Sequence, residues 1–257
     1  MTSPAAPLTA AIGWLLLILL VLPVAGLIGG SSVQELTAAL ALPSTQAALS
    51  LSLRTTGASL LLTLVLGTPL AWSLSRRRRR WHGVARAAVE LPLVLPPAVL
   101  GVALLETFGR AGWLGGLLGT SLPFSTAAVV LAQLIVGAPL YVLTAAAAFR
   151  AVDDDLLLVA RTLGASAGRA WWSIAVPAAA PGLLSGAALA WARALGEFGA
   201  TLMFAGNLPG RTQTLPLAIY GALERDLAQA RAISVLLVIV ALAVLLGMRA
   251  AGSGRAR

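Results

Sequence analysis

The chain has 257 residues, of which 59% are apolar and only 11% are charged, and its mean hydropathy is +0.92. This composition lies far outside the range of soluble domains and predicts an all-α membrane protein. The absence of Cys excludes disulfides and thiolate metal sites, and all 18 basic residues are Arg. Without Lys the chain lacks the phosphate-binding loop of P-loop ATPases, so ATP hydrolysis by that route is excluded.

Six apolar stretches are long enough, or nearly so, to cross a bilayer core of roughly 30 Å. They lie near residues 11–28, 55–75, 91–105, 127–149, 182–204 and 232–248. The third is short and contains Pro92, Pro96 and Pro97, which predicts a kinked or re-entrant segment. The spans leave no room for a soluble domain. We therefore expect a single membrane domain over residues 1–257, with its core at about 50–250.

The arginine positions predict the orientation of the spans. A run of five Arg at 76–80 follows the second span, and the positive-inside rule places it, with both termini, in the cytoplasm. Arginines 76–80, 86, 150, 161, 169, 249, 255 and 257 then lie inside, and 54, 110, 211, 225 and 231 lie outside. We interpret the run as a topology signal beside anionic lipid, not as a nucleic-acid site. No basic residue precedes the first span, which favours a retained span over a cleaved signal peptide.

Residues 150–177 form a polar-capped segment between two spans. Asp153 and the two acids after it can cap and charge a helix over 156–163, and Gly164 can close that helix in a left-handed turn. Ser166 can open a second helix, which we expect to end before Pro177. A helix–glycine–helix elbow in a membrane loop predicts a docking surface.

This elbow resembles the cytoplasmic loop of ABC-importer permeases, whose pattern is Glu-Ala-Ala, three residues, Gly, nine residues, Ile, two residues, Pro. Ala160, Gly164, Ile174 and Pro177 fall in register, whereas Leu158 stands where the family has its glutamate and Val159 where it has the first alanine. The resemblance implies a cytoplasmic ATPase partner. The residues it would contact are Ala160, Arg161, Thr162, Leu163, Gly164, Ile174 and Pro177.

The fifth span carries two further patterns. Gly182, Gly186, Ala190 and Ala194 recur every four residues, which predicts close approach of another helix, either within the chain or from a second subunit. Arg193 and Glu197 lie one turn apart on the next face. Because charged groups are costly in lipid, we expect them to pair and to face the protein interior or an aqueous path.

Residues 194–220 resemble the molybdate permease subunits of ABC importers. The shared elements are Gly-Glu-Phe-Gly-Ala-Thr at 196–201, Asn-x-Pro-Gly at 207–210 and Thr-x-Thr-Leu-Pro at 212–216, and residues 91–101 resemble the same family's proline-rich span. The resemblance implies an inner-membrane homodimer of six-span subunits with two cytoplasmic ATPase subunits and an extracytoplasmic oxyanion-binding protein. Molybdate is the expected substrate, and tungstate or sulfate remains open.

Two groups of candidate residues follow from this segment. The candidate pathway or gate comprises Arg193, Gly196, Glu197 and Thr201, and the external loop comprises Asn207, Gly210, Arg211, Thr212 and Thr214. A tetrahedral dianion needs donors and weak positive charge along its path, which Arg193 and the threonine hydroxyls offer.

The alternative from another class is an ion-coupled secondary transporter, which usually carries several intramembrane ionisable residues at broken helices. This chain offers one Arg–Glu pair. A membrane scaffold would explain the spans but not the elbow. Glu197 is the only acid in the spans, so paired carboxylates for an intramembrane hydrolase are missing and we expect no enzyme activity. A single His, His82, makes a metal site improbable, and no cofactor is expected.

Overall fold

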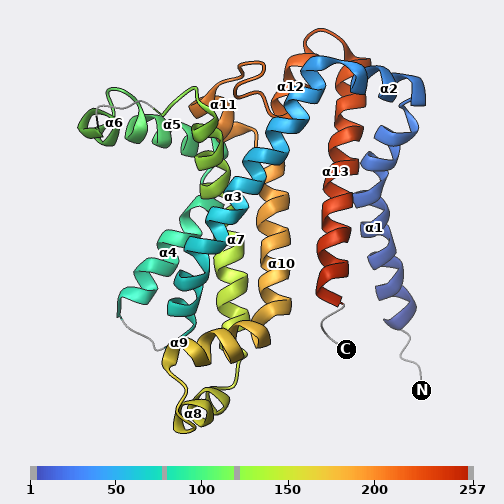
Figure 1. Ribbon diagram of the computed structural model, residues 1–257. Helices are drawn as coiled ribbons and strands as arrows, with labels where there is room; N and C mark the ends of the chain where they lie inside the picture. The colour runs from blue at the N-terminus through green and yellow to red at the C-terminus, as the bar shows by residue number, and fades with distance from the viewer. Residues whose placement is uncertain (1–4, 77–79, 119–121, 254–257) are drawn as a thin grey trace.

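The computed structural model describes residues 5–76, 80–118 and 122–253 (Figure 1). Within these ranges the chain forms helices and no strand. Five helical segments are long and apolar enough to cross a membrane: α1 (Ala5–Gly29), α3 (Pro43–Ser75), α7 (Thr126–Arg150), the continuous run Ala167–Leu195 and α13 (Leu227–Ser253). The shorter helices are α2 (Val33–Ala41), α6 (Trp113–Leu118), α8 (Asp154–Thr162), α11 (Gly199–Ala205) and α12 (Leu215–Leu223).

The proline-rich third span is broken, as its sequence predicts. α4 (Arg80–Val94) and α5 (Pro97–Phe108) meet at a bend of 116°, which makes them a broken span or a re-entrant loop. Pro96 and Pro97 lack the N–H groups that would continue α4, and Pro97 instead occupies the first turn of α5, where that N–H is not needed. Counted together, the pair brings the total to six spans.

The run Ala167–Leu195 corrects the expectation that the helix after Ser166 ends before Pro177. It passes from α9 (Ala167–Ala170) through one π-helical turn (Trp171–Ala175) into α10 (Val176–Leu195). In the widened turn the Val176 N–H donates to the Trp171 carbonyl, five residues earlier. The wider turn accommodates the missing N–H of Pro177 without ending the helix.

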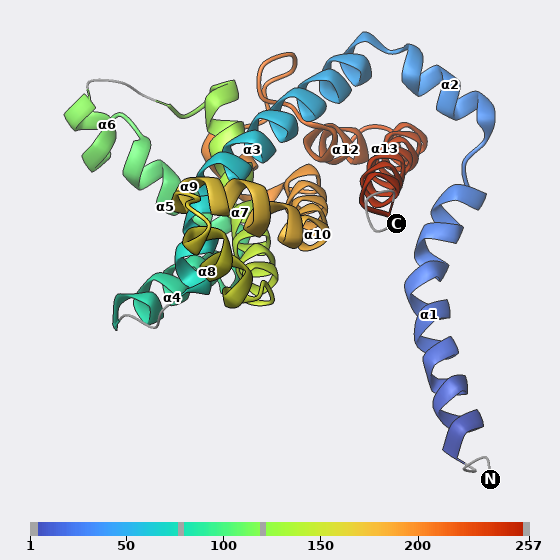
Figure 2. The same cartoon turned by 60° about the horizontal axis from the view of Figure 1, so that its bottom comes forward.

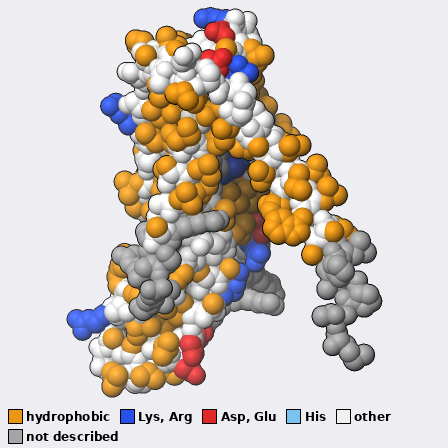
Figure 3. Space-filling view, turned by 90° about the vertical axis from the view of Figure 1, so that its right-hand side faces the viewer, with side chains coloured by type: hydrophobic (Ala, Val, Ile, Leu, Met, Phe, Trp, Pro, Cys, Tyr) orange, Lys and Arg blue, Asp and Glu red, His pale blue; other side chains and the backbone are white. Residues whose placement is uncertain are grey.

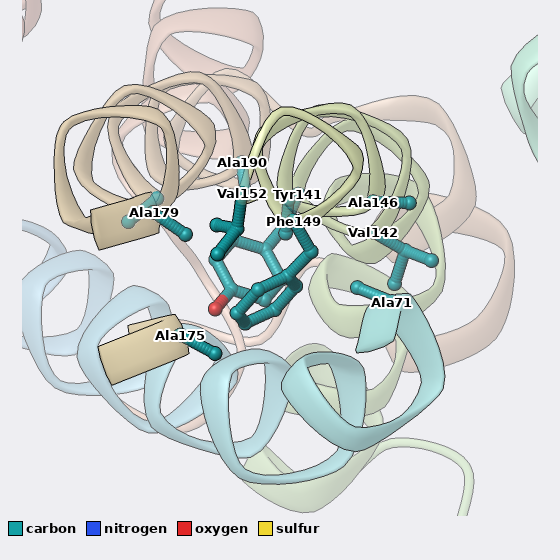
Figure 4. Close-up of a cluster of buried hydrophobic side chains, with 11 residues drawn as sticks. Ala71, Tyr141, Val142, Ala146, Phe149, Val152, Ala175, Ala179 and Ala190 are labelled. Atoms are coloured by element: carbon teal, nitrogen blue, oxygen red, sulfur yellow. The ribbon is translucent and has the colours of Figure 1, made fainter. Parts of the chain in front are cut away.

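The centre of the bundle is formed by α3, α7 and α10. Tyr141 and Phe149 of α7 are buried among small side chains, including Ala71 of α3 and Ala179 of α10 (Figure 4). The hydroxyl groups of Tyr141 and Thr68 share a hydrogen bond of 2.5 Å. Large aromatic side chains thus fill the space that the alanines leave, which is the dense packing expected of a helical core.

The small-residue stripe of the fifth span packs within the chain, against α7. A Cβ at Gly182 would stand inside van der Waals distance of the Ala148 Cβ, and one at Gly186 would lie 3.2 Å from the Thr144 Cβ. The close approach is reciprocal, because a Cβ at Gly137 of α7 would lie 2.8 Å from the Ala190 carbonyl oxygen. Of the two interpretations that the sequence leaves open, the structure confirms intrachain packing.

Gly182→Ala is therefore expected to destabilise the bundle by about 1–3 kcal/mol, as overpacking typically does. The added methyl group would clash with the Ala148 Cβ, and neither atom can move away unless the backbone of α7 or α10 moves. Gly57→Ala is the control, because its added Cβ meets nothing within 4 Å. Thermal unfolding of the purified protein should show a lower midpoint for Gly182→Ala alone, and equal midpoints for the two variants would contradict this packing.

α1 forms an N-terminal arm, most of which stands away from the bundle (Figure 2). Its described side chains are almost all exposed and apolar, and Figure 3 shows them along the arm. α2 joins the arm to α3 and begins with a reciprocal capping box between Ser32 and Glu35. Glu35 also pairs with Arg231 of α13 at 3.3 Å. The first span was predicted from its apolar length, whereas α2 was not predicted.

Candidate functional site

The predicted elbow is confirmed in its local geometry. Asp153 caps α8, its Oδ1 accepting from the Asp155 N–H at 2.9 Å. α8 ends at a left-handed turn in which Gly164 has a φ of +88°, a conformation that favours glycine. The Ser166 hydroxyl then accepts from the Arg169 N–H at 3.3 Å and begins the next helix. α8 lies at one end of the bundle, away from the loops that flank α12 (Figure 1).

One face of α8 is apolar and uncovered. Leu156, Val159 and Leu163 are 53%, 55% and 82% exposed, whereas Leu157 packs on the α7–α10 core. Of the predicted contact residues, Arg161, Thr162 and Gly164 are exposed and Ala160 is half-buried. Ile174 and Pro177 lie in the π turn and α10, on the stem that leads into the membrane. An exposed apolar face on a short capped helix is suited to bind a groove on another protein.

Arg76 attaches the elbow to the spans. Its guanidinium pairs with the Asp154 carboxylate at the start of α8 and lies 4.0 Å above the Trp72 ring at the end of α3. Trp72 packs edge-on against Phe149 of α7, with ring centroids 5.2 Å apart, and against Trp171 of the π turn at 6.4 Å. Burial lowers the pKa of Arg76, which stays charged because its ordinary value is so high. This cluster was not predicted, because the sequence signals it only by tryptophans at helix ends.

The fifth span is not continuous, which corrects the expectation of one helix over 182–204. α10 ends at Leu195 with Gly196 as its C-cap, and α11 begins at Gly199. The break is held by Glu197, which is only 1% exposed and whose Oε1 accepts from the Ala200 N–H at 2.7 Å. A carboxylate at the start of α11 satisfies a free helix N–H and favours the break.

Arg193 and Glu197 meet as predicted. Arg193 Nη1 lies 2.8 Å from Glu197 Oε2, in the geometry of an ion pair rather than of a directed hydrogen bond. The two partners differ in exposure, since the Arg193 side chain is 34% exposed and Glu197 is buried. The ion pair therefore links the buried break between α10 and α11 to a side chain, Arg193, that is partly exposed.

α11 rests closely on the bent third span. A Cβ at Gly199 would lie 2.9 Å from the Pro97 Cβ, and one at Gly101 would lie 2.6 Å from the Met203 Cβ. Thr201, in the first turn of α11, is fully buried, and its hydroxyl has no hydrogen-bond partner among the described residues. The structure thus brings Gly196, Glu197 and Thr201 together at one break beside the α4–α5 bend.

The external loop is held by its own side chains. The Thr212 hydroxyl accepts from the Leu208 N–H at 3.0 Å and donates to the Gly206 carbonyl at 3.3 Å. The Gln213 amide donates to the Asn207 Oδ1 at 2.9 Å. These bonds make Thr212 and Asn207 structural parts of the loop.

The remaining external-loop candidates differ in exposure. Gly210 turns the chain with a φ of +73°, and the Arg211 side chain is exposed. Thr214 is buried at the start of α12. In Figure 1 the loop lies at the opposite end of the bundle from α8, so the structure separates the two sets of candidates.

Comparison with known proteins identifies the family. The model of the binding-protein-dependent transport system inner membrane component family matches residues 63–251. The chain is 50% identical over 211 residues to the molybdenum transport system permease protein ModB of Mycobacterium bovis, covering 81% of this chain and 80% of that protein. It is 38% identical over 207 residues to ModB of Escherichia coli, covering 79% and 90%.

A solved structure supports the fold. The bacterial alginate ABC transporter in complex with alginate pentasaccharide-bound periplasmic protein aligns with a TM-score of 0.73 at 18% identity, covering 95% of this chain and 91% of that one. With its apolar spans and this family match, the chain is a multi-pass membrane protein. It belongs to the family of binding-protein-dependent transport system inner membrane components.

Proposed function

We propose that the chain is the permease subunit of an ABC importer that carries molybdate into the cell. The observation that carries the proposal is the 50% identity to a molybdenum transport permease over 81% of the chain. The exposed apolar face of α8, closed by the left-handed Gly164, supports it as the surface that an ATPase would bind. Tungstate and sulfate are the alternative substrates, because both are tetrahedral dianions.

The proposed assembly is a homodimer with two cytoplasmic ATPase subunits and an extracytoplasmic oxyanion-binding protein. ATP binding draws the two α8 elbows together and opens the outer face, and hydrolysis resets it. The stem from α9 through the π turn into α10 is one continuous helical run, so movement of the elbow is transmitted to α10. The break at Glu197 lies at the far end of that same helix.

The experiment that tests this proposal is uptake by proteoliposomes containing the chain, its ATPase and its binding protein. We expect ATP-dependent, vanadate-sensitive uptake of molybdate, with tungstate and sulfate as competitors that rank the three anions. Uptake driven by a proton or sodium gradient without ATP would instead establish a secondary transporter. Sulfate uptake unaffected by molybdate would reject the substrate and retain the importer.

The proposed orientation, with α8 and both termini in the cytoplasm, is tested by labelling. The chain contains no Cys, so single introduced cysteines report without background. Arg211→Cys and Arg169→Cys both replace exposed side chains, at opposite ends of the bundle. In intact cells a membrane-impermeant thiol reagent should label Arg211→Cys alone, and opening the membrane should add Arg169→Cys. The reverse order would invert the topology.

A further inference from the structure

A second feature at the α8 end is a pocket of about 900 Å³ between the end of α3, the start of α4 and the inner side of α8. Its lining combines basic and aromatic side chains, namely Arg76, Arg150, Arg161, Trp72, Trp81 and Trp171. Asp154 and Asp155 also line it, and Asp154 is already paired with Arg76.

The Arg76 guanidinium is held with one edge unused. Nη1 pairs with Asp154, and the flat face of the group lies on Trp72. Nε and Nη2, which form one edge of the guanidinium, are buried and have no hydrogen-bond partner among the described residues. Two parallel N–H groups on one edge match two oxygens of a phosphate, and a guanidinium fixed on an aromatic ring is already oriented to bind them.

Trp171 supplies a third donor in the same lining. Its indole Nε1 is buried and likewise lacks a partner among the described residues. Among the described residues, each buried side-chain polar atom of the pocket lining that has no partner is thus an N–H donor. Buried donors without acceptors are costly, so the lining favours a ligand that supplies acceptors, and the positive charge of Arg76, Arg150 and Arg161 favours an anionic one.

The surroundings indicate where the anion comes from. Trp81 and Trp172 are exposed at this end of the spans, and tryptophan gathers where a membrane meets water. The apolar face of α8 formed by Leu156, Val159 and Leu163 does not line the pocket. Of the residues predicted to contact an ATPase, only Arg161 lines the pocket, so an ATPase bound to that face leaves the rest of the lining open to the lipid headgroups beside it.

We propose that this pocket binds the phosphate group of an anionic phospholipid from the leaflet at the α8 end. The phosphate oxygens accept from the free edge of Arg76 and from the Trp171 indole, while Arg150 and Arg161 contribute positive charge at the rim. The bound headgroup fixes the elbow against the end of α3. Only the identity of that leaflet as the cytoplasmic one rests on the orientation proposed above.

Native mass spectrometry of the purified full chain tests the proposal, with phosphatidylglycerol and phosphatidylcholine of the same acyl chains as probes. The wild type should retain phosphatidylglycerol in preference to phosphatidylcholine. Trp171→Phe removes one N–H donor and keeps an aromatic ring, so it should weaken phosphatidylglycerol binding about fivefold, as one lost hydrogen bond does. Trp172→Phe, the exposed neighbour outside the lining, is the matched control and should bind as the wild type does.

Arg76→Lys is the second variant, because it keeps the charge and loses the two-pronged edge. It should also weaken phosphatidylglycerol binding, and Trp171→Phe decides the matter if Arg76→Lys fails to fold. Equal retention of the two lipids, or unchanged binding by Trp171→Phe, would overturn the proposal. Displacement of the lipid by equimolar inorganic phosphate or molybdate would overturn it too, in favour of a free-anion site. No readout depends on transport, so failure of the importer proposal would show separately.

Discussion

Gly164→Val is expected to lower substrate uptake about tenfold or more while the spans still fold. A β-branched residue at a φ of +88° is strained by roughly 1–3 kcal/mol, and 1.4 kcal/mol corresponds to a factor of ten. A Cβ added at Gly164 meets nothing within 4 Å, so the expected penalty comes from the backbone conformation and not from a clash at the Cβ. The strain must be relieved by reshaping the elbow, which displaces α8 from the position in which it would bind an ATPase. Co-purification of the ATPase subunit and uptake should fall together.

Gly168→Val is the matched control for this experiment. Gly168 lies in the same loop, has equally open space at its Cβ and sits in α9, where φ is in the ordinary helical range. Because valine has a slightly higher helix propensity than glycine, the control should leave stability unchanged or raise it by a few tenths of a kcal/mol, and uptake should be unchanged. Normal ATPase association and uptake by Gly164→Val at normal expression would reject docking through the elbow.

The elbow was predictable because it is built from local interactions. The Asp153 cap, the Gly164 turn and the Ser166 cap each involve residues within five positions of one another. Its attachment was not predictable, because Arg76 and Asp154 are 78 positions apart and nothing local pairs them. For α2 the sequence does carry a signal, since Ser32 followed three residues later by Glu35 is a capping-box pattern.

The spans themselves follow from apolar length, but their breaks do not. The bend before Pro97 has a local cause that the sequence displays. The break at 196–198 has no proline, and its segment is apolar enough to read as one helix. This break is stabilised by the Glu197 carboxylate, which accepts a hydrogen bond from the Ala200 N–H. An averaged hydropathy does not reveal such a single contact. At Pro177 the sequence predicted a helix end where the structure has a continuous helix, because a π turn can carry a helix past a proline.

Arg193→Met alone is expected to destabilise the protein by about 3–5 kcal/mol, because Glu197 would remain buried without its counter-charge. Arg193→Met with Glu197→Gln should be more stable than Arg193→Met. The glutamine is neutral, and its carbonyl oxygen can still accept from the Ala200 N–H that Glu197 Oε1 binds. Thermal unfolding of the purified protein measures both, and a double variant less stable than Arg193→Met would contradict the pairing.

Arg86 and Glu90 provide the matched control. They have the same spacing of four residues and a similar distance of 2.9 Å, but both side chains are largely exposed. Exposed pairs contribute little, so Arg86→Met with Glu90→Gln should leave the unfolding midpoint nearly unchanged. A loss equal to that at Arg193 would show that the method reports charge removal in general and not burial.

Transport then separates a packing role of the pair from a gating role. If the pair only packs, the double variant of Arg193 and Glu197 should transport at a near-normal rate once it is folded. We expect instead that it assembles with the ATPase and transports poorly, with ATP hydrolysis no longer stimulated by the loaded binding protein. The reason is geometric: the pair sits on the α10–α11 break, with Glu197 capping α11 and the partly exposed Arg193 available to an anion. A membrane-embedded charge that faces an open side is costly to keep and is usually retained for function. Full transport by a stably assembled double variant would exclude the gate, and Glu197 would then be a helix cap with a counter-ion.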